Sequence, residues 1–158
     1  PTQIGLLRNL VSLYLERNTL SGNLPPEIGQ LVQLKFLDLE YNGLTGTLPA
    51  ALGNLWQMNV LFLGANEFTG DVPMSLLDLK YLDVLGLDGT NITGTIFAHL
   101  PESLKMLFLS YTDLDRQLPE KLIGRLTNLQ EFDAMFSNIV GPIPSTVGLM
   151  TSLEWFNF

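Results

Sequence analysis

The chain has 158 residues, of which 46% are apolar and only 15% are charged, so its composition is that of a folded protein. Its formal net charge of -8 argues against nucleic acid and an anionic membrane surface as partners, because both attract lysine and arginine. The absence of cysteine excludes disulfides and thiolate metal sites, and charged or amide residues interrupt every apolar run that could insert into a membrane.

A leucine pattern repeats along the chain. Its first full copy starts at residue 10 and its second at residue 34, and the frame restarts at residues 58, 82, 104, 129 and 153. The successive spacings are 24, 24, 24, 22, 25 and 24 residues. We therefore predict a single array over 1–158, with partial repeats at 1–9 and 153–158 and no cap at either end. Such an array is expected to be an internal stretch of a longer solenoid.

The first half of each repeat predicts one short strand. Side chains alternate along a strand, so the fourth and sixth positions, such as Leu13 and Leu15, share one side. One repeat cannot cover these leucines, so neighbouring repeats must stack as a parallel sheet with one strand per repeat. The ninth position is always polar, and we expect it to satisfy backbone groups in the following turn. This column contains Asn18, Asn42, Asn66, Thr90, Thr112 and Ser137.

The second half of each repeat predicts a turn and a short helical segment. Gly22 and Pro25 in the first repeat recur as Gly46 and Pro49 in the second. Glycine adopts backbone conformations closed to other residues, and proline blocks extension of a strand ladder. The short distance from each proline to the next glycine leaves room for about one helical turn. We therefore expect short helical turns on the side opposite the sheet.

Together these residues resemble the plant-type leucine-rich repeat, Leu-x-x-Leu-x-Leu-x-x-Asn-x-Leu-x-Gly-x-Leu-Pro, over nearly the whole chain. The resemblance implies an α/β fold, a right-handed horseshoe solenoid with a parallel concave sheet, one strand per ~24-residue repeat and short helical turns on the convex side. It also implies an additional small strand near each Leu-x-Gly segment. Family members are mainly receptor-like or secreted surface proteins. An extracellular or cell-surface location, in a membrane-associated signalling glycoprotein, is therefore implied, with no cofactor.

Two repeats depart from this pattern. The fourth is two residues short, with Phe97 where proline is expected, so its Pro101 and the following turn are displaced. The fifth has Arg116 where the other repeats have glycine. We expect a local change in the curvature of the solenoid at these repeats.

The concave face is the predicted binding surface. The third, fifth, seventh and eighth positions of each repeat project onto it and have no role in the core. Clustered exposed aromatic side chains are typical of binding hot spots, so we predict a protein or peptide partner. Acidic residues outnumber the single base Arg17 on this face, which favours a basic or amphipathic partner. The predicted contact residues are Tyr14, Phe36, Asp38, Phe62, Phe108, Tyr111, Asp133, Phe136 and Trp155.

Other interpretations of the same surfaces remain open. The aromatic residues suit a sheet surface and can simply pack on one another, which would make the segment a structural scaffold without a ligand. A threonine array that includes Thr45, Thr69 and Thr93 resembles ice-binding solenoids, although Asp71 interrupts it. Asn91 lies in the chain's only Asn-x-Ser/Thr triplet, which predicts a possible N-glycosylation site.

Catalysis is not expected. Glu16 and Glu40 occupy the same column on adjacent strands, at about the 5 Å separation used by retaining glycosidases. However, an acid catalyst needs an apolar pocket to keep it protonated, and an open face does not predict one. The single histidine, His99, has no second histidine or cysteine to share a metal, so we predict a surface residue and no metal site.

Overall fold

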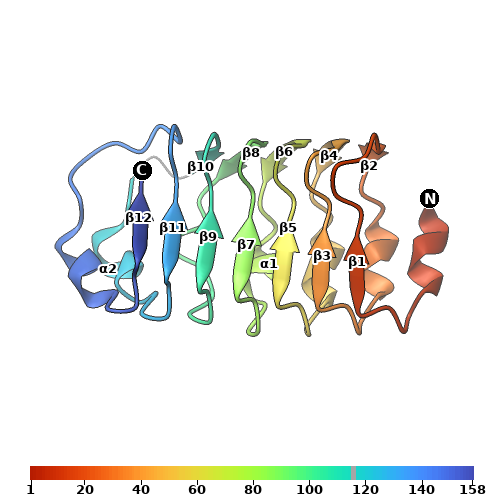
Figure 1. Ribbon diagram of the computed structural model, residues 1–158, viewed down its shortest axis with the longest axis horizontal. Coiled ribbons are helices and arrows are strands. Elements are labelled where there is room, and N and C mark those ends of the chain that lie inside the picture. Colours follow the sequence, from red (N-terminus) through yellow and green to blue (C-terminus); the bar gives the residue numbers. More distant parts are fainter. Residues whose placement is uncertain (115–116) are drawn as a thin grey trace.

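The chain forms two parallel sheets joined by short helical turns. The computed structural model describes residues 1–114 and 117–158, with all side chains in these ranges except those of residues 121 and 122. Figure 1 shows the repeats side by side, with one strand of the main sheet contributed by each. The two ends of the chain lie at opposite ends of this row. The predicted leucine-rich-repeat solenoid is therefore confirmed.

The main sheet has seven strands in the order β1-β3-β5-β7-β9-β11-β12, all parallel. We call its solvent-facing side the front face, which corresponds to the predicted concave side. Each strand begins at the third position of a repeat, as the leucine spacing predicted. The strands are β1 (Ser12–Tyr14), β3 (Phe36–Asp38), β5 (Val60–Phe62), β7 (Val84–Gly86), β9 (Met106–Phe108), β11 (Glu131–Asp133) and β12 (Trp155–Asn157).

A second sheet of five parallel strands runs behind the first, in the order β10-β8-β6-β4-β2. Neighbouring strands of this sheet pair two residues out of step with the 24-residue repeat. Thr47, for example, pairs with Thr69, 22 residues on, and not with Asp71. The shift places Gly46, at φ +76°, beneath Asn23, whose Oδ1 would lie 2.7 Å from an added Cβ. The strands are β2 (Ser21–Asn23), β4 (Gly43–Thr47), β6 (Glu67–Asp71), β8 (Asn91–Gly94) and β10 (Asp113–Leu114).

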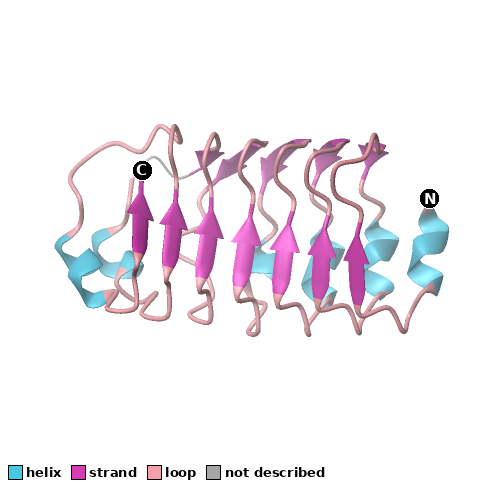
Figure 2. Cartoon of the chain, viewed as in Figure 1, coloured by secondary structure: helices cyan, strands magenta, loops and turns pink. Residues whose placement is uncertain are grey.

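Short helical segments cover the side opposite the main sheet, as Figure 2 shows. Four are single 3-10 turns and two are four-residue α-helices. Five of them, η2, η3, α1, α2 and η4, begin directly after the proline of their repeat, because proline cannot donate to a strand ladder and so ends the extended segment before the helical turn. The segments are η1 (Thr2–Leu6), η2 (Pro26–Gln30), η3 (Ala50–Asn54), α1 (Met74–Leu77), α2 (Glu120–Ile123) and η4 (Ser145–Leu149).

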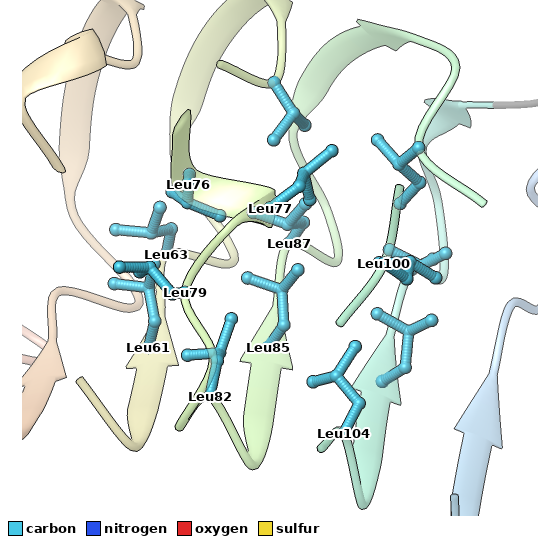
Figure 3. Packing of buried hydrophobic residues seen from close by; sticks show 14 of the residues in the cluster. Leu61, Leu63, Leu76, Leu77, Leu79, Leu82, Leu85, Leu87, Leu100 and Leu104 are labelled. Atoms are coloured by element: carbon cyan, nitrogen blue, oxygen red, sulfur yellow. The ribbon is translucent and has the colours of Figure 1, made fainter. Parts of the chain in front are cut away.

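Stacked leucines fill the space between strands and helical turns. Leu61 in β5 is 1% exposed and Leu63, directly after β5, is 0% exposed. Figure 3 shows them beside Leu85 and Leu87 of the next repeat. Burying one such side chain contributes roughly 1.5–3 kcal/mol. The core therefore depends on contact between neighbouring repeats, and Leu13 of β1 is only partly buried.

The ninth-position side chains satisfy the turn backbone as predicted. The amide of the buried Asn66 donates to the carbonyls of Leu39, Leu63 and Gly64 at 2.9 to 3.1 Å. Its Oδ1 accepts from the Leu44 N–H at 3.0 Å, so one side chain links two repeats. The Thr90 hydroxyl donates only within its own repeat, to the Leu87 carbonyl at 2.6 Å.

The short fourth repeat lacks a helical segment. Residues 95–105 contain turns but no helix between β8 and β9, so the displaced turn is confirmed. Phe97 occupies the core here, 3% exposed, with its ring centroid 6.0 Å from that of Phe132. His99 is exposed in this turn. Arg116, the other predicted irregularity, lies outside the described residues, and the expected change in curvature stays a prediction.

Candidate functional site

The front face contains an open depression near its centre, which we call the acidic hollow. Its volume is about 280 Å³, and its lining residues come from five consecutive repeats. Phe62, Phe108 and Asp133 are the last residues of β5, β9 and β11. Glu40 and Asp88 lie two residues after the ends of β3 and β7. The lining residues are Glu40, Phe62, Asp88, Phe108, Ser110 and Asp133.

Gly86 creates the floor of the acidic hollow. It ends β7, between the strands that carry Phe62 and Phe108, and it has no side chain to separate their rings. The two ring centroids are therefore 6.2 Å apart, although a whole strand lies between them. A Cβ on Gly86 would lie 2.5 Å from Cδ1 of Phe62, which is too close for the ring to keep its place. The aromatic floor thus depends on this glycine.

Carboxylates surround the aromatic floor. Asp133 is held in place, because the Ser110 hydroxyl donates to its Oδ1 at 2.7 Å and the Asn157 amide approaches the same atom at 3.4 Å. The Glu40 N–H donates to Oδ1 of Asp38 at 3.0 Å, which places a further carboxylate beside the hollow. Lys105 and Arg125, which do form ion pairs, do not line this depression. The hollow is therefore a negatively charged site with apolar walls.

The crowding of these acids changes their pKa values. Burial, followed by the neighbouring carboxylates of Asp88 and Asp38, raises the pKa of Glu40 from 4.5 to about 7. Arg17 opposes this rise. Burial also raises the pKa of Asp88, against the effect of its own backbone hydrogen bond, and Asp133 adds to the rise. The sequence-based argument that an open face keeps its acids ionised is therefore wrong for Glu40.

Such an arrangement favours a cationic group. A positive charge among the carboxylates relieves their mutual repulsion, and aromatic ring faces attract cations when water is excluded. Among the described residues, no three His, Cys, Asp or Glu side chains are placed to hold a metal ion. An ammonium or guanidinium group carries such a charge and can donate several hydrogen bonds to carboxylates.

A second aromatic feature lies where the strands end. Tyr111 and Phe136, 63% and 67% exposed, stack with ring centroids 5.0 Å apart and an interplanar angle of 25°. Both adopt the left-handed backbone conformation, with φ of +57° and +55°. This conformation is unfavourable for residues other than glycine. The turn nevertheless imposes it at the eighth position of every full repeat. We call this pair the rim pair.

The remaining predicted contact residues are spread along the face. Phe36 begins β3 and is half-buried, with Asp38 two residues on. Tyr14 is exposed on β1, and Trp155 is exposed on β12 at the other edge of the sheet. With six strand steps of about 4.8 Å between them, these two are on the order of 30 Å apart. The structure thus brings together Phe62, Phe108 and Asp133, pairs Tyr111 with Phe136, and leaves Tyr14 and Trp155 at opposite ends.

Part of the hollow was not predicted from the sequence. Glu40 was considered only as a possible catalytic acid, and Asp88, Ser110 and Gly86 were not among the predicted contact residues. The available signal was the glycine at a fifth position otherwise occupied by large or polar side chains. Asn91 is exposed on β8 of the second sheet, and its glycosylation stays a prediction.

No helix among the described residues is long and apolar enough to cross a membrane.

Comparison with known proteins agrees with this architecture. The model of the leucine-rich-repeat family matches residues 9–31 and 33–55. The PEPR1-AtPEP1 structure matches with a TM-score of 0.93 and 30% identity, over 100% of this chain and 22% of that one. The plant peptide hormone receptor RGFR1, solved in complex with RGF2, matches with a TM-score of 0.87 and 33% identity, over 99% and 25%.

A plant ice-binding protein also matches, with a TM-score of 0.72 and 28% identity over 85% of this chain and 43% of that one. No curated protein matches the sequence significantly. The chain spans 22% of the PEPR1 structure's chain and 25% of the RGFR1 chain. The repeat pattern, the two parallel sheets and these similarities agree. The chain belongs to the leucine-rich-repeat proteins, and its repeats are of the plant type.

Proposed function

We propose that this chain is a recognition module that binds a peptide or protein segment along the front face, with a basic group of that ligand seated in the acidic hollow. The observation that carries the proposal is the aromatic floor formed by Phe62 and Phe108 over Gly86, with Glu40, Asp88 and Asp133 around it. The core does not require this arrangement, because the leucines that hold the repeats together point the other way.

The electrostatics of the hollow support a cationic ligand. Half-buried carboxylates with raised pKa values carry an unfavourable free energy that a bound ammonium or guanidinium group removes. Charge-assisted hydrogen bonds to such groups contribute about 1.5–3 kcal/mol each. A lysine or arginine side chain, or a free amino terminus, is therefore the part of the ligand that we place here.

The rim pair supports a second anchor on the same ligand. Tyr111 directly follows Ser110 of the hollow, and its stacked partner Phe136 directly follows Met135, whose N–H donates to the Ser110 hydroxyl at 2.8 Å. The hollow and the rim pair are therefore parts of one continuous surface. A ligand with a basic residue near an apolar one fits both, which makes an amphipathic, basic peptide the preferred partner class.

The structural similarities support the same function and suggest its setting. One of the matching structures is a plant peptide hormone receptor in complex with RGF2. By analogy we place this chain in an extracellular or cell-surface receptor-like protein and assign it no catalytic role. A glycan on Asn91 would project from the second sheet, so it would leave the front face open.

A selection of peptides tests the proposal. The chain is panned with a phage-displayed library of random linear peptides, in parallel with the variant Glu40→Gln/Asp88→Asn. We expect the chain to enrich peptides with lysine or arginine next to an apolar residue, and the variant to lose this enrichment. The matched control is Glu67→Gln/Asp71→Asn on the second sheet, which should keep it. Enrichment of basic peptides by all three proteins, or by none, would contradict the front-face proposal and favour a scaffold without a ligand.

An ice-binding surface is the second candidate, because the second sheet is parallel and exposes threonines. Thr47, Thr69 and Thr93 are exposed on neighbouring strands, and a plant ice-binding protein has a similar structure. However, the array is interrupted by Asp71, which accepts a hydrogen bond from the Thr93 hydroxyl at 2.9 Å. Thermal hysteresis of the chain, and its loss on Thr47→Lys/Thr69→Lys substitution, would establish this function.

A further inference from the structure

A second exposed aromatic surface lies away from the front face, at the edge where the main strands begin. We call it the flank surface. It is formed by the connections that lead from η2 into β3, from η3 into β5 and from α1 into β7. Trp56 and Tyr81 are 56% and 59% exposed there. The flank surface comprises Lys35, Trp56, Gln57, Asn59, Lys80 and Tyr81.

The two aromatic side chains separate two open hollows. One, of about 240 Å³, lies on the strand side and includes Lys35. The other, of about 270 Å³, lies toward the helical turns and includes Lys80. Trp56 and Tyr81 line both hollows and so form an aromatic ridge between them. Lys35 lies on one side of this ridge and Lys80 on the other. A side chain that enters either hollow meets an aromatic surface and a positive charge together.

The solenoid does not require aromatic residues at these positions. Trp56 lies two residues before the first position of its repeat, and Tyr81 lies one residue before that of the next. The equivalent positions of the other repeats accept small, aliphatic, amide or charged side chains without loss of the fold. These are Arg8, Asn9, Val32, Gln33, Glu102, Ser103, Thr127, Asn128, Thr151 and Ser152. The aromatic residues of the flank surface therefore contribute nothing that the repeat architecture needs.

Hydrogen bonds hold the flank surface in place but leave the rings free. The Gln57 amide donates to Oε1 of Gln33 at 3.0 Å, and the Asn59 amide donates to the carbonyl of Tyr81 at 2.9 Å. Within the part of the chain that the structure describes, the Trp56 indole N–H and the Tyr81 hydroxyl have no hydrogen-bond partner. Both groups are commonly satisfied at interfaces, where the ring supplies apolar contact and the polar end donates.

The charge of the flank surface is opposite to that of the chain. Lys105 pairs with Asp83 and Arg125 with Glu102, each at 3.0 Å. Lys35 and Lys80 form no such pair among the residues described, and Asp78 is the one carboxylate that lines either hollow. The flank surface is therefore a basic, aromatic patch on a protein whose net charge is -8.

We propose that the flank surface is a second docking site, for an acidic segment of another protein in which apolar side chains alternate with carboxylates. Apolar side chains of such a segment pack against Trp56 and Tyr81, while its carboxylates pair with Lys35 and Lys80. The acidic front face repels the same segment, so the chain's own charge directs it to the flank. The site does not depend on the function proposed for the acidic hollow.

Tryptophan fluorescence tests the proposal, because the chain has only two tryptophans. The variant Trp155→Phe leaves Trp56 as the sole reporter. The probe is a capped hexapeptide of alternating leucine and glutamate, and its neutral analogue contains glutamine in place of glutamate. We expect the acidic peptide to shift the Trp56 emission to the blue with saturation, and added salt to weaken binding. The neutral analogue should produce no saturable shift.

Lysine variants identify the contacts. In the Trp155→Phe background, Lys35→Gln/Lys80→Gln should weaken binding of the acidic peptide about tenfold, as expected for two exposed ion pairs. Lys105→Gln is the matched control, because Lys105 occupies the same repeat position as Lys35 and already has a partner. Its affinity should stay within about twofold. Circular dichroism establishes that each variant is folded.

Several outcomes would overturn the proposal. Equal binding of the neutral and acidic peptides would exclude a role for charge, and so would unchanged affinity in the double lysine variant. If up to about 1 mM acidic peptide produced no emission shift, its dissociation constant would lie above the millimolar range and the proposal would be wrong. A shift produced by a neutral glucan hexasaccharide, but not by the acidic peptide, would assign the aromatic ridge to a carbohydrate instead.

Discussion

The acidic hollow and the flank surface use aromatic side chains in different ways. In the hollow, Phe62 and Phe108 contact each other over Gly86 and are half-buried. On the flank, Trp56 and Tyr81 are more than half exposed, and no ring contact joins them. The hollow is surrounded by carboxylates, whereas the flank has two lysines, Lys35 and Lys80, that form no ion pair among the residues that the structure describes.

This difference shows that one leucine core can support two surface features whose structures do not depend on each other. Both features lie on the same stack of leucines, yet one requires a missing side chain at Gly86 and the other requires only exposed positions in a connection. Substitutions in the hollow should therefore change both binding and stability. Substitutions on the flank should change binding alone.

Removal of the aromatic floor should have the largest effect. In Phe62→Ala/Phe108→Ala, the hollow loses both ring faces, and each aromatic anchor of this kind contributes about 2 kcal/mol or more to binding. The affinity for a basic peptide enriched on the chain should fall at least about 100-fold, as measured by fluorescence anisotropy. Unchanged affinity would show that the peptide binds elsewhere.

A methyl group at Gly86 should have the next largest effect. In Gly86→Ala the new Cβ displaces the Phe62 ring, and such overpacking typically costs about 1–3 kcal/mol. Chemical denaturation should report this loss of unfolding free energy, and peptide binding should weaken with it. The matched control is Gly148→Ala, where no heavy atom lies within 4 Å of the added Cβ. Equal losses in both variants would contradict the proposed role of the ring contact.

Binding to the hollow should depend on pH near neutrality. A cationic ligand prefers the ionised form of Glu40, and the raised pKa of about 7 means that this form declines as pH falls. The affinity should therefore drop about five- to tenfold from pH 8 to pH 6. In Glu40→Gln most of this dependence should disappear. A pH profile of the affinity that is identical in both proteins would assign the titration to another group.

The same carboxyl should affect stability with the opposite sign. Folding raises the pKa of Glu40, so its contribution is most favourable below the unfolded value of 4.5 and is lost as pH rises through about 7. Glu40→Gln should therefore stabilise the protein at pH 8 and have little effect at pH 5. Because the side chain is only half-buried, we expect about 1 kcal/mol, or about 2–4 °C in Tm. A larger gain at pH 5 than at pH 8 would contradict this sign.

The flank should give the smallest change in stability. Trp56→Ala removes a side chain that is 56% exposed and contacts no other ring, so the unfolding free energy should change by less than about 0.5 kcal/mol. Phe62→Ala should cost clearly more, because its ring contacts Phe108. Equal stability losses in the two variants would remove the distinction between the surfaces.

Periodic features of the fold were predictable because each depends on one position of the repeat. The leucines at the fourth and sixth positions place every main strand, and the ninth-position residues satisfy the turn backbone, as Asn66 shows. The two residues missing from the fourth repeat likewise predicted its displaced turn. These signals work because the same local environment recurs in each unit.

The hollow depends on contacts that cross several repeats, and these were not predictable. Phe62 and Phe108 belong to strands that do not pair with each other, and only the missing side chain of Gly86 allows their rings to meet. The raised pKa of Glu40 depends mainly on burial and on Asp88, two repeats away, and Glu16 in the neighbouring repeat contributes least. The flank was overlooked because its residues lie in connections, where aromatic spacing carries no periodic signal.

The titration of Glu40 tests the central claim most directly. Carbon-detected NMR follows the Glu40 carboxyl from pH 4 to pH 9, alone and with an enriched basic peptide at saturation. We predict a pKa of about 7 without the peptide, because burial and neighbouring carboxylates disfavour the charge. With a cationic group in the hollow, the pKa should fall by about one unit or more. A pKa that stays the same when the peptide binds would contradict the account.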